Sequence, residues 1–364
     1  MSEKKRESNF ELLRIVAALL IFMCHAYQHT PAQSSYWFYF PRGTFNWLGY
    51  SGNYCFALIS GWFLSKSTFT WKKWLLLYAE YWFYNVVFGT IMFCLGASSP
   101  VALIKCFLPM CIGGNWYMRV YLIFFLFLPF LNKLVPTLTR REHFWLCILL
   151  FAIGNVYTNV IPVFKTEFSV GHIFPFFTSF FVGSYVRLYS PRFFGKQKRN
   201  VAFAVLFFFI LFVWPNVVKF ISKNVSFLFL HNHLFEFYLA VGGNMRMIFP
   251  FLLGLSLFAV FKNLKVPSIK AINTLGSTTL AVYLIHTQKD FNRAIWYVLA
   301  KMVGENPPPS KFFLCAVALA FATFAVCAAV DLVRQRLLER PLAKYADRID
   351  QFVRAKVAPA VKVS

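Results

Sequence analysis

Charged residues are scarce in this chain. They make up 14% of the 364 residues, whereas hydrophobic residues make up 59% and aromatic residues 20%. Water-soluble domains are about half apolar and about a quarter charged, so this composition excludes a water-soluble fold. Apolar stretches of about 20 residues, the length that spans a bilayer, recur between Phe10 and Val333. The sequence therefore predicts an all-α, polytopic bundle of transmembrane helices.

Motifs that bind metals, bind nucleotides or form disulfides are also missing. None of the eight cysteines belongs to a C-x-x-C pair, and no histidines have the spacing of metal ligands. Walker loops, G-x-S-x-G elbows and G-x-G-x-x-G turns are not found. We therefore expect no metal site, and we interpret the cysteines as reduced packing residues.

The excess of positive charge is distributed in short clusters. The formal net charge is +24, but the Lys and Arg residues lie between apolar runs rather than in one continuous basic patch. This arrangement argues against nucleic-acid binding and follows the positive-inside rule. Basic connections lie near residues 4–6, 66–73, 133–141, 192–199 and 262–270 and in the tail. We therefore expect a multi-pass protein of the bacterial inner membrane with both termini in the cytoplasm.

Apolar windows bounded by charge, Pro or Gly predict about ten helices. They lie near 10–29, 46–65, 73–96, 114–134, 143–161, 171–189, 200–221, 243–262, 274–299 and 311–334. The segment 226–239 is too short and too polar to span, and we expect it to be re-entrant or interfacial. We predict a membrane domain at 1–340, followed by a basic cytoplasmic tail at 341–364 that attaches to anionic lipid headgroups.

Ionisable side chains at membrane depth are costly, by about 2.5 to 3.5 kcal/mol each on insertion scales, and so point to partners or to chemistry. Arg14 and His25 are eleven positions apart on the first helix, which places them within about 20° of one face and about 16 Å apart. One lumen could present both to a long anionic donor. Alternatively, Arg14 pairs with Glu11, and His25 is a helix-end residue.

Two further residues are candidates for the same site. Arg119 lies more than a turn into the fourth predicted helix and is expected to face the interior. His286 closes the run GSTTLAVYLIH at a depth similar to that of His25, and a neutral imidazole can act as a general base. A polar residue satisfied within the core is the alternative for His286. Asp331 and Arg334 have the spacing of a local ion pair, and we assign them no chemistry.

Five segments resemble the acyltransferase-3 family: NFELLRIVAALLIFMCHA, FALISGWFL, NWYMRVYLIFFLFLPFLN, FFVGSYVRLY and TLAVYLIH. The most specific feature is an Arg and a His separated by ten residues, here Arg14 and His25. The resemblance implies a bacterial membrane enzyme that transfers acetyl or other acyl groups to hydroxyls of surface polysaccharides. It also implies that His25 is the catalytic base or acyl relay and that Arg14 binds the phosphates or orients the donor. The resemblance extends these roles to Arg119, for the donor, and to His286, for catalysis.

The predicted function is therefore O-acylation. Acetyl-CoA is the expected donor, and a polysaccharide or lipid-linked glycan is the expected acceptor, with the bilayer as the remaining partner. A secondary transporter or glycan flippase is the competing hypothesis, because intramembrane Arg and His residues also serve as substrate and proton sites. A third possibility is an assembly subunit without activity, which binds no acyl-CoA.

Overall fold

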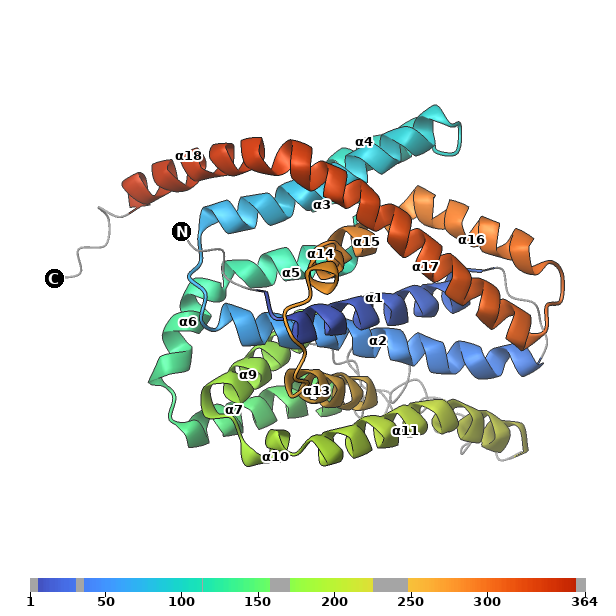
Figure 1. Cartoon of the computed structure of the whole chain (residues 1–364), viewed down its shortest axis with the longest axis horizontal. Coiled ribbons are helices and arrows are strands. Elements are labelled where there is room, and N and C mark those ends of the chain that lie inside the picture. Colours follow the sequence, from blue (N-terminus) through green and yellow to red (C-terminus); the bar gives the residue numbers. More distant parts are fainter. Residues whose placement is uncertain (1–5, 31–35, 113, 158–170, 225–247, 358–364) are drawn as a thin grey trace.

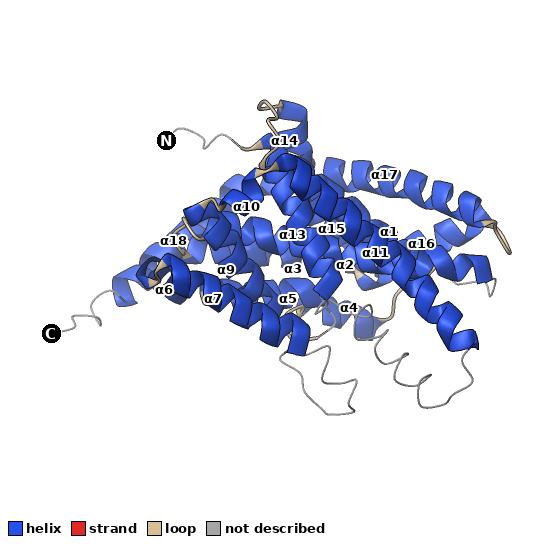
Figure 2. Ribbon diagram, turned by 90° about the horizontal axis from the view of Figure 1, so that it is seen from below, coloured by secondary structure: helices blue, strands red, loops and turns tan. Residues whose placement is uncertain are grey.

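The computed structural model describes residues 6–30, 36–112, 114–157, 171–224 and 248–357. Within these ranges the chain is helical and forms no β-strand, which confirms the predicted all-α bundle. Long helices run roughly side by side along the molecule (Figures 1 and 2). The expected re-entrant segment at 226–239 lies outside the described residues.

Helix α1 (Ser8–His29) is the central element of the bundle. It packs against α2 (Tyr36–Leu64), α13 (Ile248–Lys262) and the segments at 270–303. Small and apolar side chains cover its inner face, and Leu13, Ala17 and Cys24 are buried. Because neighbouring helices enclose α1, any polar group on its inner face must meet a protein partner or a cavity.

Glycines permit a close contact between α2 and α9 (Phe174–Tyr189). A Cβ atom on Gly61 would lie 2.6 Å from the Ser179 carbonyl oxygen, and one on Gly183 would lie 2.6 Å from the Leu58 carbonyl oxygen. Neither position has room for a side chain. Small residues that let backbones approach are typical of helix packing in membranes, where lipid provides no hydrophobic driving force.

The structure corrects two of the predicted helices, each of which is broken. The fourth divides into α5 (Trp116–Leu126) and α6 (Leu128–Thr137), bent by 58°. Pro129 lies in the first turn of α6, and proline has no backbone N–H to continue the hydrogen-bond ladder. The ninth divides into α14 (Lys270–Ser277), α15 (Thr279–His286) and α16 (Lys289–Val303). The Gln288 side chain caps α16 by accepting hydrogen bonds from the amides of Asp290 and Phe291.

The other helices complete the bundle around this frame. They are α3 (Trp71–Cys94), α4 (Pro100–Phe107), α7 (Arg140–Phe151), the π-helix η1 (Ala152–Tyr157), α10 (Arg192–Gly195), α11 (Gln197–Asn224), α17 (Pro309–Arg334), the π-helix η3 (Gln335–Glu339) and α18 (Arg340–Val357). Helix α18 belongs to the predicted tail and packs against α3. The backbone amide of Trp71 donates to Asp350, and Lys72 pairs with Asp347.

Among the described residues, two helices are long and apolar enough to cross a membrane. They are Ser8–His29 and the continuous helix Pro309–Lys356, and the bent pair α5–α6 makes a third if it is one span. Helix α3, which carries Glu80 in its interior, is not among them. Apolar helices identify a membrane protein, while the count of ten spans and the orientation stay predictions.

The predicted pair of Asp331 and Arg334 is confirmed, but it belongs to a larger buried cluster. Arg334 Nε lies 2.7 Å from Asp331 Oδ1, and Arg334 Nη2 lies 3.4 Å from Glu80 Oε1 on α3. The Tyr84 hydroxyl donates to Asp331 Oδ1 at 2.6 Å. Asp331 is fully buried. The cluster therefore joins α3 to α17 by an ion pair and a hydrogen bond in addition to apolar packing.

We predict that Asp331→Ala destabilises the protein by about 3 to 5 kcal/mol, because it leaves the buried Arg334 without its nearest carboxylate. Asp347→Ala is the matched control. It removes a carboxylate from a half-exposed pair, whose loss costs about 0 to 1 kcal/mol. Denaturant unfolding in detergent micelles measures both values. Equal losses of stability in the two variants would show that the buried cluster stabilises the protein no more than a surface ion pair does.

Candidate active site

His25 on α1 and His286 on α15 lie in contact. Nδ1 of His25 is 3.0 Å from Nε2 of His286, and the two ring centroids are 5.2 Å apart. His286 is fully buried, and its Nδ1 lies 2.7 Å from the carbonyl oxygen of Val282, one turn back on α15. A chain of hydrogen bonds therefore runs from the backbone of α15 through His286 to His25.

The geometry of this chain determines which nitrogens carry hydrogen. A carbonyl oxygen can only accept, so Nδ1 of His286 is the donor to Val282. In a neutral imidazole the other nitrogen is then an acceptor, so Nε2 of His286 receives the hydrogen bond from Nδ1 of His25. Nε2 of His25 is left with a lone pair. No described residue forms a hydrogen bond with that nitrogen.

His25 lines a cavity of about 810 Å³. Trp116 and Arg119 of α5 form part of its wall, and Trp296 and Tyr297 of α16 form another part. From the sequence, both histidines were candidates for one site. In the structure His286 is buried behind His25 and does not line the cavity, so only His25 faces it. The cavity thus combines one imidazole, cationic groups and several aromatic faces.

Arg119 is the cationic group of α5 in this cavity. Its side chain is half-buried, and no carboxylate among the described residues pairs with it. An unpaired guanidinium in a membrane protein is costly, so its position beside the cavity of His25 indicates a site for negative charge. The expectation that Arg119 faces the interior is confirmed.

Asn115 ties α5 to the end of α15. It caps α5 by accepting from the amide of Met118, and its Oδ1 also accepts from the Tyr283 hydroxyl at 3.1 Å. Its Nδ2 donates to the hydroxyl of Thr287 at 3.0 Å. The residues after the break at His286 are therefore fixed to the helix that carries Arg119.

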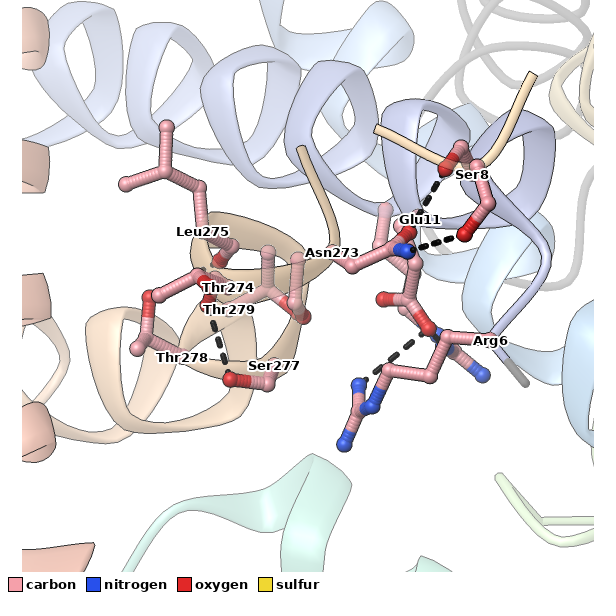
Figure 3. A network of polar contacts seen from close by, with 12 residues as sticks. Arg6, Ser8, Glu11, Asn273, Thr274, Leu275, Ser277, Thr278 and Thr279 are labelled. Carbon is pink, nitrogen blue, oxygen red and sulfur yellow. Dashed lines mark hydrogen bonds and ion pairs between the residues drawn. The ribbon is translucent and has the colours of Figure 1, made fainter. Parts of the chain in front are cut away.

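Arg14 lies on a different cavity, of about 290 Å³. Its Nη1 is 2.6 Å from Glu11 Oε1. The same carboxylate oxygen pairs with Arg6 at 3.2 Å (Figure 3). The pairing with Glu11 is thus present, and it does not keep Arg14 from lining the cavity together with Arg6. Ser8 donates to Asn273 beside this pair, which ties the start of α1 to α14.

Tyr283 lines both cavities. The structure therefore corrects the expected single lumen, since Arg14 and His25 belong to two neighbouring spaces on either side of this side chain. Sequence reasoning missed both Tyr283 and Asn115. The available signal was an Asn directly after Gly113 and Gly114 and before an apolar run, which is typical of a helix N-cap.

Two further aromatic side chains among the described residues, Trp47 and His172, do not line this cavity. Trp47 is buried in a cluster with Leu48 and Leu253. His172 lies against Trp116, with ring centroids 4.9 Å apart. His231, His233 and Arg246 lie outside the described residues. Among the described residues, no three His, Cys, Asp or Glu side chains group as metal ligands would.

Comparison with known proteins gives one match. The family model Acyl_transf_3, described as an acyltransferase domain, matches residues 7–332. This range includes α1, most of α17, and every residue that lines the two cavities except Arg6. No curated protein and no solved structure matches the chain.

We predict that Asn115→Ala destabilises the protein by about 2 kcal/mol or more, because it removes a helix cap and partly buried hydrogen bonds between helices. Thr139→Ala is the matched control, since Thr139 caps α7 on the surface and its loss costs about 1 kcal/mol. Thermal unfolding in detergent measures the difference. A smaller effect at Asn115 than at Thr139 would contradict the proposed connection between α5 and α15.

Proposed function

Because the chain belongs to the Acyl_transf_3 family of acyltransferases, we propose that it is a membrane O-acyltransferase that uses acyl-CoA. The acyl group is acetyl, and the acceptor is a hydroxyl of a cell-surface polysaccharide or lipid-linked glycan. One observation carries the proposal. His25 lines the larger cavity, and its Nε2 has no partner among the described residues, while its Nδ1 is held by His286.

On the donor side, the proposal places the phosphates of acetyl-CoA near Arg14 and Arg6. Guanidinium groups bind phosphates through paired, charge-assisted hydrogen bonds. The cavity of about 290 Å³ would take the pantetheine arm rather than the nucleotide. The thioester would reach His25 after Tyr283, which lies between the two cavities, moves aside. In this scheme Arg14 binds the donor and takes no part in proton transfer.

On the acceptor side, Nε2 of His25 takes the proton from a sugar hydroxyl as its oxygen attacks the thioester carbonyl carbon. The carbon–sulfur bond then breaks, the acyl group stays on the sugar oxygen, and the thiolate of CoA takes the proton from His25. Arg119 would stabilise the negative charge on the carbonyl oxygen in the transition state. Trp116, Trp296 and Tyr297 offer apolar faces to the sugar ring.

His286 has a positioning role in this scheme. By accepting from Nδ1 of His25, it holds the tautomer whose lone pair is on Nε2. The carbonyl of Val282 holds His286 in the same way. Relays of this kind orient reactive imidazoles without touching the substrate.

The proposed location is the bacterial inner membrane, crossed several times, with both termini in the cytoplasm. Acetyl-CoA then enters from the cytoplasm at the Arg14 end of α1, and the glycan reaches His25 from the outer side. The basic connections support this orientation through the positive-inside rule.

A secondary transporter or glycan flippase is the second candidate, and the broken helices favour it. The interruption at Thr287 lies on the larger cavity, and transporters bind substrates at such breaks. Movement of a glycan across proteoliposomes without consumption of acyl-CoA would support transport. Acyl transfer in detergent, where no compartments exist, would support the enzyme.

We predict that His25→Ala lowers kcat for acetyl transfer by about 100-fold or more, which is the usual loss on removal of a general base. Arg14→Ala should instead raise KM for acetyl-CoA, because it removes a phosphate contact. Both effects are measured with purified protein in lipid nanodiscs, labelled acetyl-CoA and a mixture of glycan acceptors. Arg348→Ala, on the exposed face of α18, is the control for loss of a cation. Normal activity in both site variants would overturn the proposal.

We predict that His286→Leu lowers kcat by about 10- to 100-fold, the usual loss for a residue that orients a reactive group, with little change in KM for acetyl-CoA. His286→Gln should retain more activity, because its amide oxygen can still accept from His25. The rate-against-pH profiles of the two variants provide the second measurement, and the Leu variant should show the larger displacement. Identical behaviour of Gln and Leu would show that His286 only fills space.

A further inference from the structure

A third cavity, of about 540 Å³, adjoins the cavity of His25. Its walls are the connection between α3 and α4, the first turns of α4, and the start of α16. Helices α4 and α16 lie at the same end of the molecule (Figure 1). Lys289 and Arg293 line both cavities, so the two spaces are neighbours across these side chains. We refer to this third cavity as the α4–α16 pocket.

Cationic side chains dominate this region. Lys105 of α4 lines the α4–α16 pocket together with Lys289 and Arg293 of α16. Arg119 adds a fourth cation in the adjoining cavity. No carboxylate among the described residues pairs with Lys105, Lys289 or Arg119. Lys105, Lys289 and Arg293 are exposed and line the same pocket, so an anion that enters it would meet more than one positive charge.

Two helix N-termini add to the positive potential. Helix α4 begins at Pro100 after its cap Ser99, and Ser99 and Val101 both line the pocket. Helix α16 begins at Lys289 after its cap Gln288, and both residues line the pocket too. Helix N-termini carry a partial positive charge and favour anions. The dipoles and the side chains therefore favour the same kind of ligand.

One carboxylate, Asp290, lines the pocket, and its charge is already satisfied. Its side chain is 4% exposed. Its Oδ2 accepts from the Ser98 hydroxyl at 2.8 Å, and its Oδ1 lies 3.6 Å from Arg293 Nη1. Asp290 thus fastens the α3–α4 connection to α16 and engages Arg293, while the two lysines stay available. The pocket keeps an excess of positive charge.

We propose that the α4–α16 pocket binds an anionic group of the acceptor, a phosphate or a carboxylate, while a neighbouring hydroxyl of the same molecule lies at His25. The acceptor would then be an acidic glycan or a glycan phosphate. This inference rests on the proposed acyl transfer. The position of the pocket supports an acceptor over the donor, because Arg6 and Arg14, which would hold the donor phosphates, line the cavity on the other side of Tyr283.

A binding experiment tests the pocket without using activity. Glucose 1-phosphate, glucuronate and methyl glucoside are titrated, by ligand-observed NMR, into the full chain in nanodiscs of zwitterionic phosphatidylcholine. We expect the two anionic sugars to bind at least about tenfold more tightly than the neutral glycoside, a difference of about 1.4 kcal/mol. Lys105→Gln/Lys289→Gln should abolish the preference while leaving the Asp290–Arg293 contact intact. Lys311→Gln, on an exposed residue of α17 that lines neither cavity, should keep it. Equal binding of charged and neutral sugars, or a preference that survives the double substitution, overturns the inference.

A kinetic experiment assigns the anion to acceptor or donor. If the inference holds, the double substitution raises KM for an acidic acceptor by about tenfold or more and leaves KM for acetyl-CoA unchanged. A rise in KM for acetyl-CoA instead would assign the pocket to the donor and refute the inference. His25→Ala should lose transfer but keep the preference for anionic sugars. If the wild-type protein transfers no acyl group yet shows that preference, the proposed function fails and the anion site stands.

Discussion

The hydrogen bond between His25 and His286 is the contact on which the candidate site depends. It joins α1, the central helix, to α15, and it orients an imidazole whose second nitrogen has no partner among the described residues. The carbonyl of Val282 fixes His286, so the direction of donation along the chain follows from an atom that can only accept. Without this relay, His25 would be a polar side chain of undefined tautomer beside a cavity.

The break in the helix after His286 supports that contact. Thr287 and Gln288 interrupt the ladder, Gln288 restarts it at α16, and Asn115 holds the break against α5. The interruption brings the cations of α16 into the same region as Arg119 and His25. A continuous helix through these residues would carry Lys289 and Arg293 onward along the axis of α15. The broken helix therefore supplies Trp296 and Tyr297 to the wall of the cavity and Lys289 and Arg293 to its positive charge.

Much of this arrangement could be predicted from the sequence, because hydropathy and charge patterns depend on local composition. The helical class, most helix positions and the candidates Arg14, His25, Arg119 and His286 came from such patterns. The breaks could not be predicted, because the apolar pattern continues through them. Each break depends on local side-chain caps, such as that of Gln288, which the apolar pattern does not reveal. The contact between His25 and His286 joins residues 261 positions apart and depends on tertiary packing. The two separate cavities depend on the position of Tyr283, which spacing along α1 does not determine.

The most direct test of this account is the hydrogen on His25. Nitrogen-15 NMR of histidine-labelled protein in lipid bilayers at neutral pH reports which ring nitrogen carries it, and the signals are assigned by their loss in His25→Ala. The account predicts a neutral His25 protonated on Nδ1, with a bare Nε2 and a hydrogen bond from Nδ1 to His286. A His25 protonated on Nε2, or on both nitrogens, would contradict it.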